Sequence, residues 1–216
     1  MRILHLLNWP LKDVEYVLDK VSSQKFNAIQ INPIQPLKED GYREWWMSYQ
    51  PCDFSIGNIY GNREDLINLC ESAKKYNLNP YYIVARILQE QGKSGSTLSS
   101  GNGYNGQYIG YYNVFNIGAS GNGKDNVINY CMNLPGLKTS NHCLQDIIIE
   151  FLNDLIDCGV MGFRFDAAKS IALPSEGNDF FERVIYCLKK YGKKAYGYLK
   201  ILEEETEKAG ITVQDA

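Results

Sequence analysis

Short apolar runs alternate with amphipathic stretches along the first part of the chain. The apolar runs 1–9 and 27–34 predict strands, and the second ends in Asn-Pro, which favours a turn into a loop. The stretches 11–25 and 63–76 carry apolar side chains at helical spacing and predict helices. Strand, helix, strand, loop and helix in this order are typical of parallel β/α units, so the sequence predicts an α/β fold.

The same alternation resumes over residues 133–200. A helix is predicted to begin after Ser140 or Asn141, either of which can cap it, and to end at Asp157. Gly159 stands where a glycine commonly terminates a helix. Next along the chain we predict a strand, a helix and a strand, over residues 160–168, 178–191 and 194–202.

The segment 78–132 differs from both flanks. Its run 81–91 places apolar residues in helical register and predicts a helix. Residues 92–123 are rich in Gly, Ser, Asn and Tyr and poor in aliphatic side chains, a composition typical of loops and binding surfaces. We therefore predict two units: a β/α part formed by 1–77 and 133–216, and a helical, Gly/Ser/Asn-rich insertion at 78–132.

Charge and cysteine content limit the classes of partner. The formal net charge is -3, which gives no electrostatic reason to expect nucleic acid or a membrane as partner. The six cysteines and two histidines are scattered, so we expect free thiols in a reducing compartment and no zinc site. The first apolar run is too short for a signal peptide or a membrane span. We expect a cytoplasmic protein, unless it is released by another route such as lysis.

Several motifs carry a family resemblance. Residues 162–169 read GFRFDAAK after the amphipathic helix 150–157, and an earlier WWMSYQP at 45–51 is followed by FSIGN at 54–58. In this order they resemble the α-amylase family, glycoside hydrolase family 13, whose members fold as TIM barrels. The resemblance implies a partial TIM (β/α) barrel, interrupted by the insertion, that acts on α-1,4-glucans.

The strand with GFRFDAAK carries the candidate nucleophile. Side chains alternate along a strand, so Arg164 and Asp166 face the same way, and at the carboxyl end of a barrel strand they would project into the active site. Arg164 would help to keep Asp166 ionised. The resemblance implies that Asp166 is the nucleophile; the alternative is a salt-bridged strand end. It also implies four substrate-binding residues: Trp46, Tyr49, Gln50 and Lys169.

The sequence also departs from the family pattern. A retaining glycosidase needs a second carboxyl about 5 Å from the nucleophile, but Lys200 takes the place of the acid, with Glu203 nearby. The predicted helix replaces the apolar third strand, which in amylases bears Asp and ends in Asn-His. The sequence stops near the fifth predicted strand, so we expect it to lack the transition-state aspartate that the family carries on later strands. Calcium is a family expectation, yet Gly136 stands where an aspartate is usual. We therefore expect impaired catalysis.

The insertion has a resemblance of its own. The runs 79–92 and 111–119 resemble motifs of the peptidoglycan N-acetylglucosaminidases of glycoside hydrolase family 73. That resemblance implies that Glu90 is a general acid and that Tyr111 and Tyr112 line a cleft; the alternative for Glu90 is a solvated carboxylate at a helix end.

Three interpretations therefore stay open. The chain is an amylase-like hydrolase, a peptidoglycan glucosaminidase, or a non-catalytic remnant that binds glycans through Trp46 and Tyr49. In each case half a barrel would expose the edge of a sheet, through which copies of the chain could associate.

Overall fold

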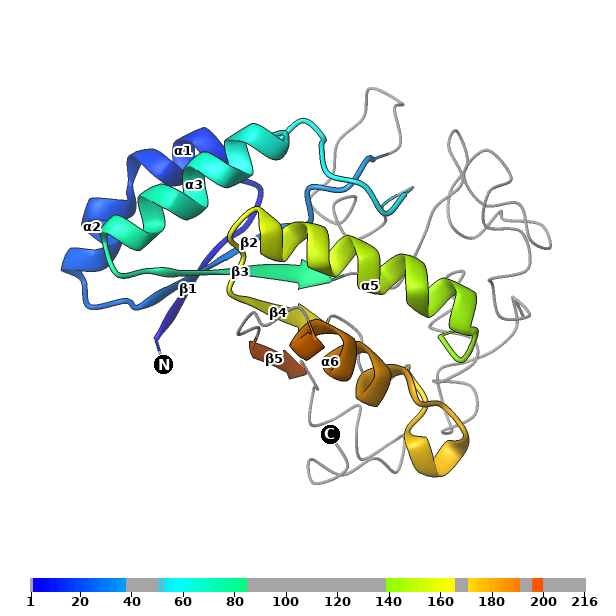
Figure 1. The fold of residues 1–216 in the computed structure, drawn as a ribbon. Coiled ribbons are helices and arrows are strands. Elements are labelled where there is room, and N and C mark those ends of the chain that lie inside the picture. Colours follow the sequence, from blue (N-terminus) through cyan, green and yellow to red (C-terminus); the bar gives the residue numbers. More distant parts are fainter. Residues whose placement is uncertain are drawn as a thin grey trace, which may run out of the picture.

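Five strands form one sheet, in which every neighbouring pair is parallel and the order is β1-β2-β3-β4-β5 (Figure 1). The computed structural model describes residues 2–37, 51, 53–84, 139–165, 171–190 and 196–199. The strands are β1 (Ile3–Leu6), β2 (Ala28–Ile31), β3 (Asn79–Val84), β4 (Gly162–Phe165) and β5 (Tyr196–Leu199). Because each strand pairs with the next along the chain, the sheet winds in one direction, as the sheet of a TIM barrel does.

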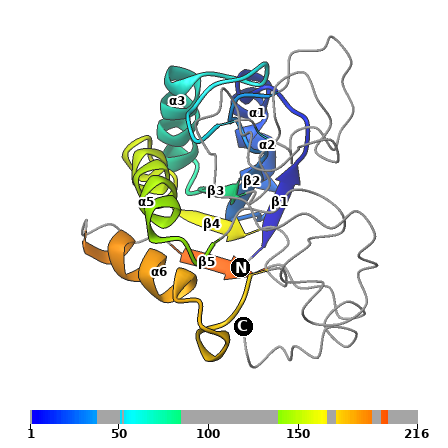
Figure 2. The ribbon, with the colours of Figure 1, turned by 90° about the vertical axis from the view of Figure 1, so that its right-hand side faces the viewer.

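The helices of the described residues lie along one side of the curved sheet (Figure 2). They are α1 (Leu11–Tyr16), α2 (Leu18–Ser23), α3 (Arg63–Lys75), α5 (His142–Asp157), the short 3-10 helix η6 (Pro174–Glu176) and α6 (Phe180–Lys190). The single helix predicted over 11–25 is divided at Val17, whose backbone leaves the helical region. Within the described ranges no helix is both long and apolar enough to cross a membrane.

Caps fix where the two longest helices begin. The side chain of Asn62 accepts from the backbone N–H of Asp65, and the Asp65 carboxylate accepts from the N–H of Asn62, which forms a capping box at α3. Asn141 Oδ1 accepts from the N–H groups of Cys143 and Leu144 at the start of α5. The predicted start and end of α5 are therefore confirmed.

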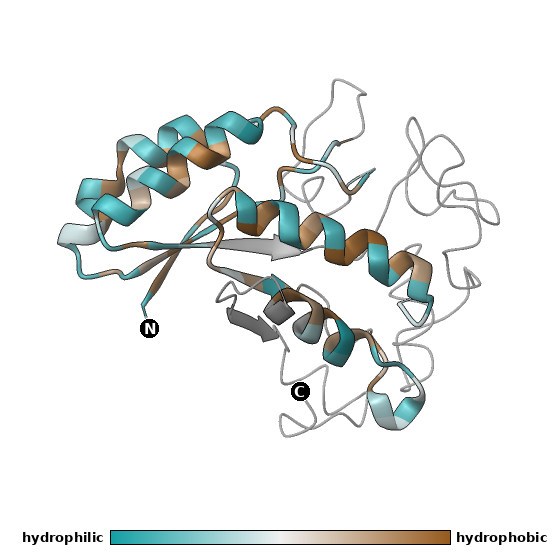
Figure 3. Ribbon diagram, in the orientation of Figure 1, coloured by the Kyte–Doolittle hydropathy of each residue, from teal (hydrophilic) through white to brown (hydrophobic). Residues whose placement is uncertain are grey.

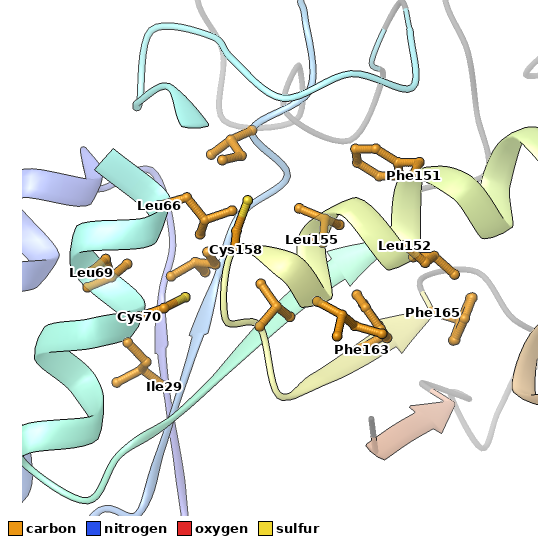
Figure 4. Packing of buried hydrophobic residues seen from close by; sticks show 14 of the residues in the cluster. Ile29, Leu66, Leu69, Cys70, Phe151, Leu152, Leu155, Cys158, Phe163 and Phe165 are labelled. Atoms are coloured by element: carbon orange, nitrogen blue, oxygen red, sulfur yellow. The ribbon is translucent and has the colours of Figure 1, made fainter. Parts of the chain in front are cut away.

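The core lies between the sheet and this layer of helices. Ile29 of β2 and Phe163 and Phe165 of β4 are buried together with Leu66 of α3 and Leu152 of α5 (Figure 4). The helices turn their apolar sides toward the sheet and their polar sides outward (Figure 3). Burying this apolar surface supplies most of the favourable free energy of folding.

The helix predicted over 81–91 is wrong for its first residues. The segment Asn79–Val84 is β3, which lies between β2 and β4 with Ala28 in register with Asn79 and Ile83 in register with Arg164. A short apolar run fits a helix and a buried strand equally well, and here pairing with two neighbouring strands decides. The third strand that the sequence analysis judged missing is thus present, and the predicted insertion boundary at residue 78 falls directly before it. Residues 85–138 lie outside the described part.

Candidate active site

The carboxyl end of the parallel sheet is where a site is expected. All five strands point the same way, so the residues that follow them meet at one edge. In parallel α/β folds, ligands bind at this edge and catalytic side chains follow the strand ends.

Arg164 is the one predicted site residue that the described part of the chain contains. It is the third residue of β4 and is only 5% exposed. Its neighbours Phe163 and Phe165 belong to the core against the helices, so strand alternation places Arg164 on the opposite face of the sheet. Its register neighbours are Ile83 of β3 and Tyr198 of β5. The arginine is thus positioned on the face that closes inward in a barrel.

The other predicted site residues lie outside the described residues. Asp166 follows β4 directly in the sequence, with one residue between it and Arg164. The remaining ones are Trp46, Tyr49, Gln50, Glu90, Tyr111, Tyr112 and Lys169. Their roles therefore stay predictions.

Two polar residues, one in β2 and one directly after it, share the face of Arg164, and they were not among the residues predicted from the sequence. Gln30 and Asn32 are buried and alternate with Ile29 and Ile31, which belong to the core against the helices. His5 of β1 is in register with Gln30. The sequence could have revealed these residues. A parallel strand that is buried on both faces by apolar residues is apolar throughout, so polar residues at every second position indicate that one face is polar.

A cluster of amide side chains lies at the carboxyl ends of β1 and β2. Asn32 Nδ2 donates to Asn8 Oδ1 at 2.9 Å, and the Tyr60 hydroxyl donates to the same oxygen at 3.4 Å. Asn8 has φ +58°, a conformation that asparagine tolerates better than most residues. Gln35 Nε2 donates to the carbonyl oxygen of Asp53 at 2.8 Å. These contacts fix the segments that follow the first two strands.

Among the described residues, two buried amide oxygens near this edge have no hydrogen-bond donor. Asn32 Oδ1 and Gln35 Oε1 are buried and accept no hydrogen bond from the described residues. A buried amide oxygen left unsatisfied costs free energy, so a hydroxyl or water donor would be stabilising here.

The described residues offer calcium no clear site. No group of three or more His, Cys, Asp or Glu side chains comes together among them. The four cysteines in these ranges, Cys70, Cys143, Cys158 and Cys187, are free thiols.

Comparison with known proteins points to one family of enzymes. No family model matches the chain. Among curated proteins, the α-amylase of Aeromonas hydrophila is 32% identical over 180 residues, covering 79% of this chain and 40% of that protein. The α-amylase of Clostridium acetobutylicum is 28% identical over 174 residues, covering 78% of this chain and 23% of that protein. The chain therefore spans less than half the length of these relatives.

The solved structures that are similar to this chain include α-amylases as well. A mutant α-amylase I from Eisenia fetida in complex with maltohexaose superposes with a TM-score of 0.76 at 21% identity, covering 93% of this chain and 45% of that chain. The chain resembles the α-amylases. The α-amylase of Geobacillus thermoleovorans complexed with acarbose gives a TM-score of 0.72 at 15% identity, covering 96% of this chain and 49% of that chain. The α/β fold of these enzymes, a TIM barrel, is the fold to which the described sheet and helices correspond.

Proposed function

We propose that the chain is an α-amylase-like glycoside hydrolase that acts on α-1,4-glucans. The observation that carries the proposal is the burial of Arg164 on the sheet face opposite the helices, two positions before Asp166 in the sequence. A buried guanidinium at a strand end favours a nearby carboxylate in its charged form, which a glycosyl-enzyme nucleophile requires. Asp166 is the nucleophile and Arg164 supports its charge.

Catalysis by this chain is impaired. The acid that protonates the leaving oxygen must be a neutral carboxyl close to the nucleophile, and Lys200 stands in its place. An ammonium group already carries its proton at neutral pH but is a much weaker acid than a carboxyl, so it protonates a glycosidic oxygen poorly. β3, with the sequence NPYYIV, adds no acidic residue beside β4.

Two arguments support the proposed substrate class: the hydrogen-bonding groups near the sheet edge and the similarity to amylases of known structure. Neutral sugars present hydroxyl groups, which can donate to amide oxygens such as those of Asn32 and Gln35. Two of the similar amylases were solved with maltohexaose or acarbose bound. A polysaccharide of α-linked glucose is the substrate that agrees with both.

The test measures release of reducing ends from soluble starch by the purified chain and by Asp166→Asn. We expect slow cleavage by the wild type and none by the variant, because an amide cannot form the glycosyl ester. Asp154→Asn is the control, since Asp154 lies on α5 and pairs with exposed Arg63 away from the strand ends. Cleavage that survives in Asp166→Asn contradicts the assignment.

The same assay on peptidoglycan separates the glucosaminidase alternative. β3 occupies the first six residues of the stretch that resembles the family 73 helix, which weighs against that alternative. Peptidoglycan cleavage lost in Glu90→Gln would nevertheless establish it. A folded chain that binds starch without cleaving it would be the glycan-binding remnant.

We also propose that the chain self-associates through a sheet edge. β1 stands at the end of the strand order in the described part of the chain, and an edge strand is where a strand of another copy can add to a sheet. Light scattering across a concentration series is expected to show a dimer that Ile3→Lys weakens, because a charge on an edge strand opposes pairing with another strand. A wild-type monomer at every concentration would contradict this proposal.

A further inference from the structure

Three large apolar side chains are exposed at the carboxyl edge of the sheet. Leu7 and Trp9 follow β1 and are 39% and 42% exposed, and Ile59, which precedes α3, is 48% exposed. The other large exposed side chains of this kind among the described residues belong to helices or to a helix end: Tyr16, Tyr76 and Tyr186. Single exposed apolar residues are ordinary, but a group of them in one place indicates a binding surface.

The two segments that carry these side chains, 7–11 and 58–61, lie against each other. The backbone N–H of Leu11 donates to the carbonyl oxygen of Tyr60 at 2.7 Å. A Cβ built on Gly61 would lie 2.8 Å from Leu11 Cδ1, so the second segment touches the first residue of α1. α1 and α3, which follow the two segments, also lie side by side (Figures 1 and 2). We call the surface that the exposed side chains form the edge platform; its members are Leu7, Trp9 and Ile59.

Hydrogen bonds hold the turn of the edge platform in one conformation. Asn58 and Gly61 exchange backbone hydrogen bonds at 3.0 and 3.2 Å, which closes a tight turn with Ile59 inside it. Asn58 Nδ2 donates to the carbonyl oxygen of Gln35 at 2.9 Å, and Asn58 Oδ1 accepts from the N–H of Tyr60 at 2.8 Å. A surface that is already ordered loses little conformational entropy on binding, so this turn is suited to hold a ligand.

An oriented amide group lies beside the apolar side chains. Asn8 precedes Trp9 and is half-buried, and its Oδ1 accepts from Asn32 Nδ2 and from the Tyr60 hydroxyl. These two bonds fix which way the amide faces, while Asn8 Nδ2 donates to no described residue. Neither segment of the edge platform carries a charged side chain. An amide donor in uncharged and partly aromatic surroundings suits a neutral ligand with hydroxyl groups.

We propose that the edge platform is a subsite that binds one glucose unit of an α-glucan chain, with the Trp9 ring against the sugar face and Asn8 Nδ2 donating to a hydroxyl. The choice of an α-glucan rests on the proposed function. Pyranose rings present C–H bonds on their faces, which pack against flat aromatic surfaces. β1 stands three strand spacings from β4, about 14 Å along the sheet, a distance that a chain of several glucose units spans. The edge platform therefore extends the binding surface beyond the unit that reacts.

The size of the edge platform favours a sugar over a protein partner. Each partner of a stable protein interface contributes about 20–30 residues. The edge platform has three large side chains on two short segments, which is enough to cover a single sugar unit. It is too small for a second copy of the chain to bind stably through it alone.

The test measures binding of maltohexaose by titration calorimetry, with every chain carrying Asp166→Asn so that cleavage does not interfere. Trp9→Ala removes the ring, whereas Trp9→Phe keeps a flat aromatic face. Tyr16→Ala is the matched control, because it removes another exposed aromatic side chain, at the end of α1. We expect Kd to rise about threefold to tenfold in Trp9→Ala and to stay within about twofold in Trp9→Phe and Tyr16→Ala.

A second measurement locates the ligand without depending on the stability of Trp9→Ala. In heteronuclear NMR spectra the indole N–H signal that disappears in Trp9→Phe belongs to Trp9, and saturating maltohexaose should shift this signal. An unshifted Trp9 signal would overturn the edge platform.

The outcomes separate the edge platform from the proposed function. Binding that depends on Trp9, in a wild-type chain that cleaves no starch, would support the edge platform and overturn the proposed function. Starch cleavage that requires Asp166, together with an unchanged Kd in Trp9→Ala, would support the proposed function and overturn the edge platform. A lower mass of Trp9→Ala in light scattering with an unchanged Kd would also overturn it, because the surface would then join copies of the chain.

Discussion

Replacing Gly159 by alanine is expected to lower the free energy of unfolding by about 3 kcal/mol, from backbone strain and from a steric clash. Gly159 follows the last turn of α5 with φ +105°, a conformation that L side chains rarely adopt. Its N–H donates to the carbonyl of Ile156, and the N–H of Val160 donates to the carbonyl of Leu155. These two bonds form a Schellman motif, which depends on this backbone conformation.

The clash makes Gly159 harder to replace than Gly57 and Gly177, the described glycines at which an added Cβ meets open space. A Cβ at position 159 would lie 2.7 Å from the Cβ of Cys70 on α3, closer than carbon atoms approach. Both atoms are tied to backbone, so one helix end must shift to make room. This shift would disturb the packing of α5 against α3 (Figure 4).

Gly177→Ala is the matched control. Gly177 also has positive φ, +85°, but a Cβ there meets nothing within 4 Å. Gly177→Ala should therefore lower the free energy of unfolding by the backbone strain alone, about 1–2 kcal/mol. Urea unfolding followed by circular dichroism measures both variants. Equal losses in the two would show that α3 and α5 do not meet closely at this glycine.

The chain is expected to lose about 4 kcal/mol of stability between pH 9 and about pH 12 through the ionisation of one buried thiol. Burial, together with the neighbouring Cys158 thiol, raises the pKa of Cys70 from 9.0 to about 12, although Lys74 opposes the rise. In the unfolded chain the thiol ionises near pH 9, whereas in the folded chain it stays neutral. Its contribution is therefore complete below pH 9 and is lost as pH rises through the folded pKa.

Cys70→Ala isolates this contribution. The unfolding free energies of the wild type and the variant, measured in urea at pH 8 and pH 11, should converge at the higher pH, because alanine cannot ionise. Cys143→Ala is the control, since Cys143 is exposed. A gap between wild type and Cys70→Ala that stays constant with pH would mean that the Cys70 thiolate is tolerated inside the fold.

Local signals in the sequence were sufficient for the helices and insufficient for β3. The bounds of α3 and α5 could be predicted closely because residue types that cap or terminate helices stand at their ends: Asn62, Asn141 and Gly159. The segment Asn79–Val84 has no comparable local signal. It becomes a strand because β2 and β4 supply partners on both sides, a non-local condition that periodicity does not contain.

The candidate site likewise has one part that could be predicted from the sequence and one part that could not. Strand alternation alone placed Arg164 away from the helix-facing residues Phe163 and Phe165, as the structure has it. The contact between Asn8 and Asn32 joins residues 24 positions apart and depends on two strands lying in register, so only the structure could bring them together.

The strictly sequential strand order also has a kinetic consequence. β1 and β2 pair residues 25 positions apart, such as Ile3 and Ala28, while β3 and β4 pair Ile83 with Arg164 across a far longer stretch of chain. Loop-closure entropy makes the longer closure about 1 kcal/mol more costly. The unit from β1 to β3 should therefore assemble first and serve as a template, onto which α5 and β4 dock in a later and slower phase of folding.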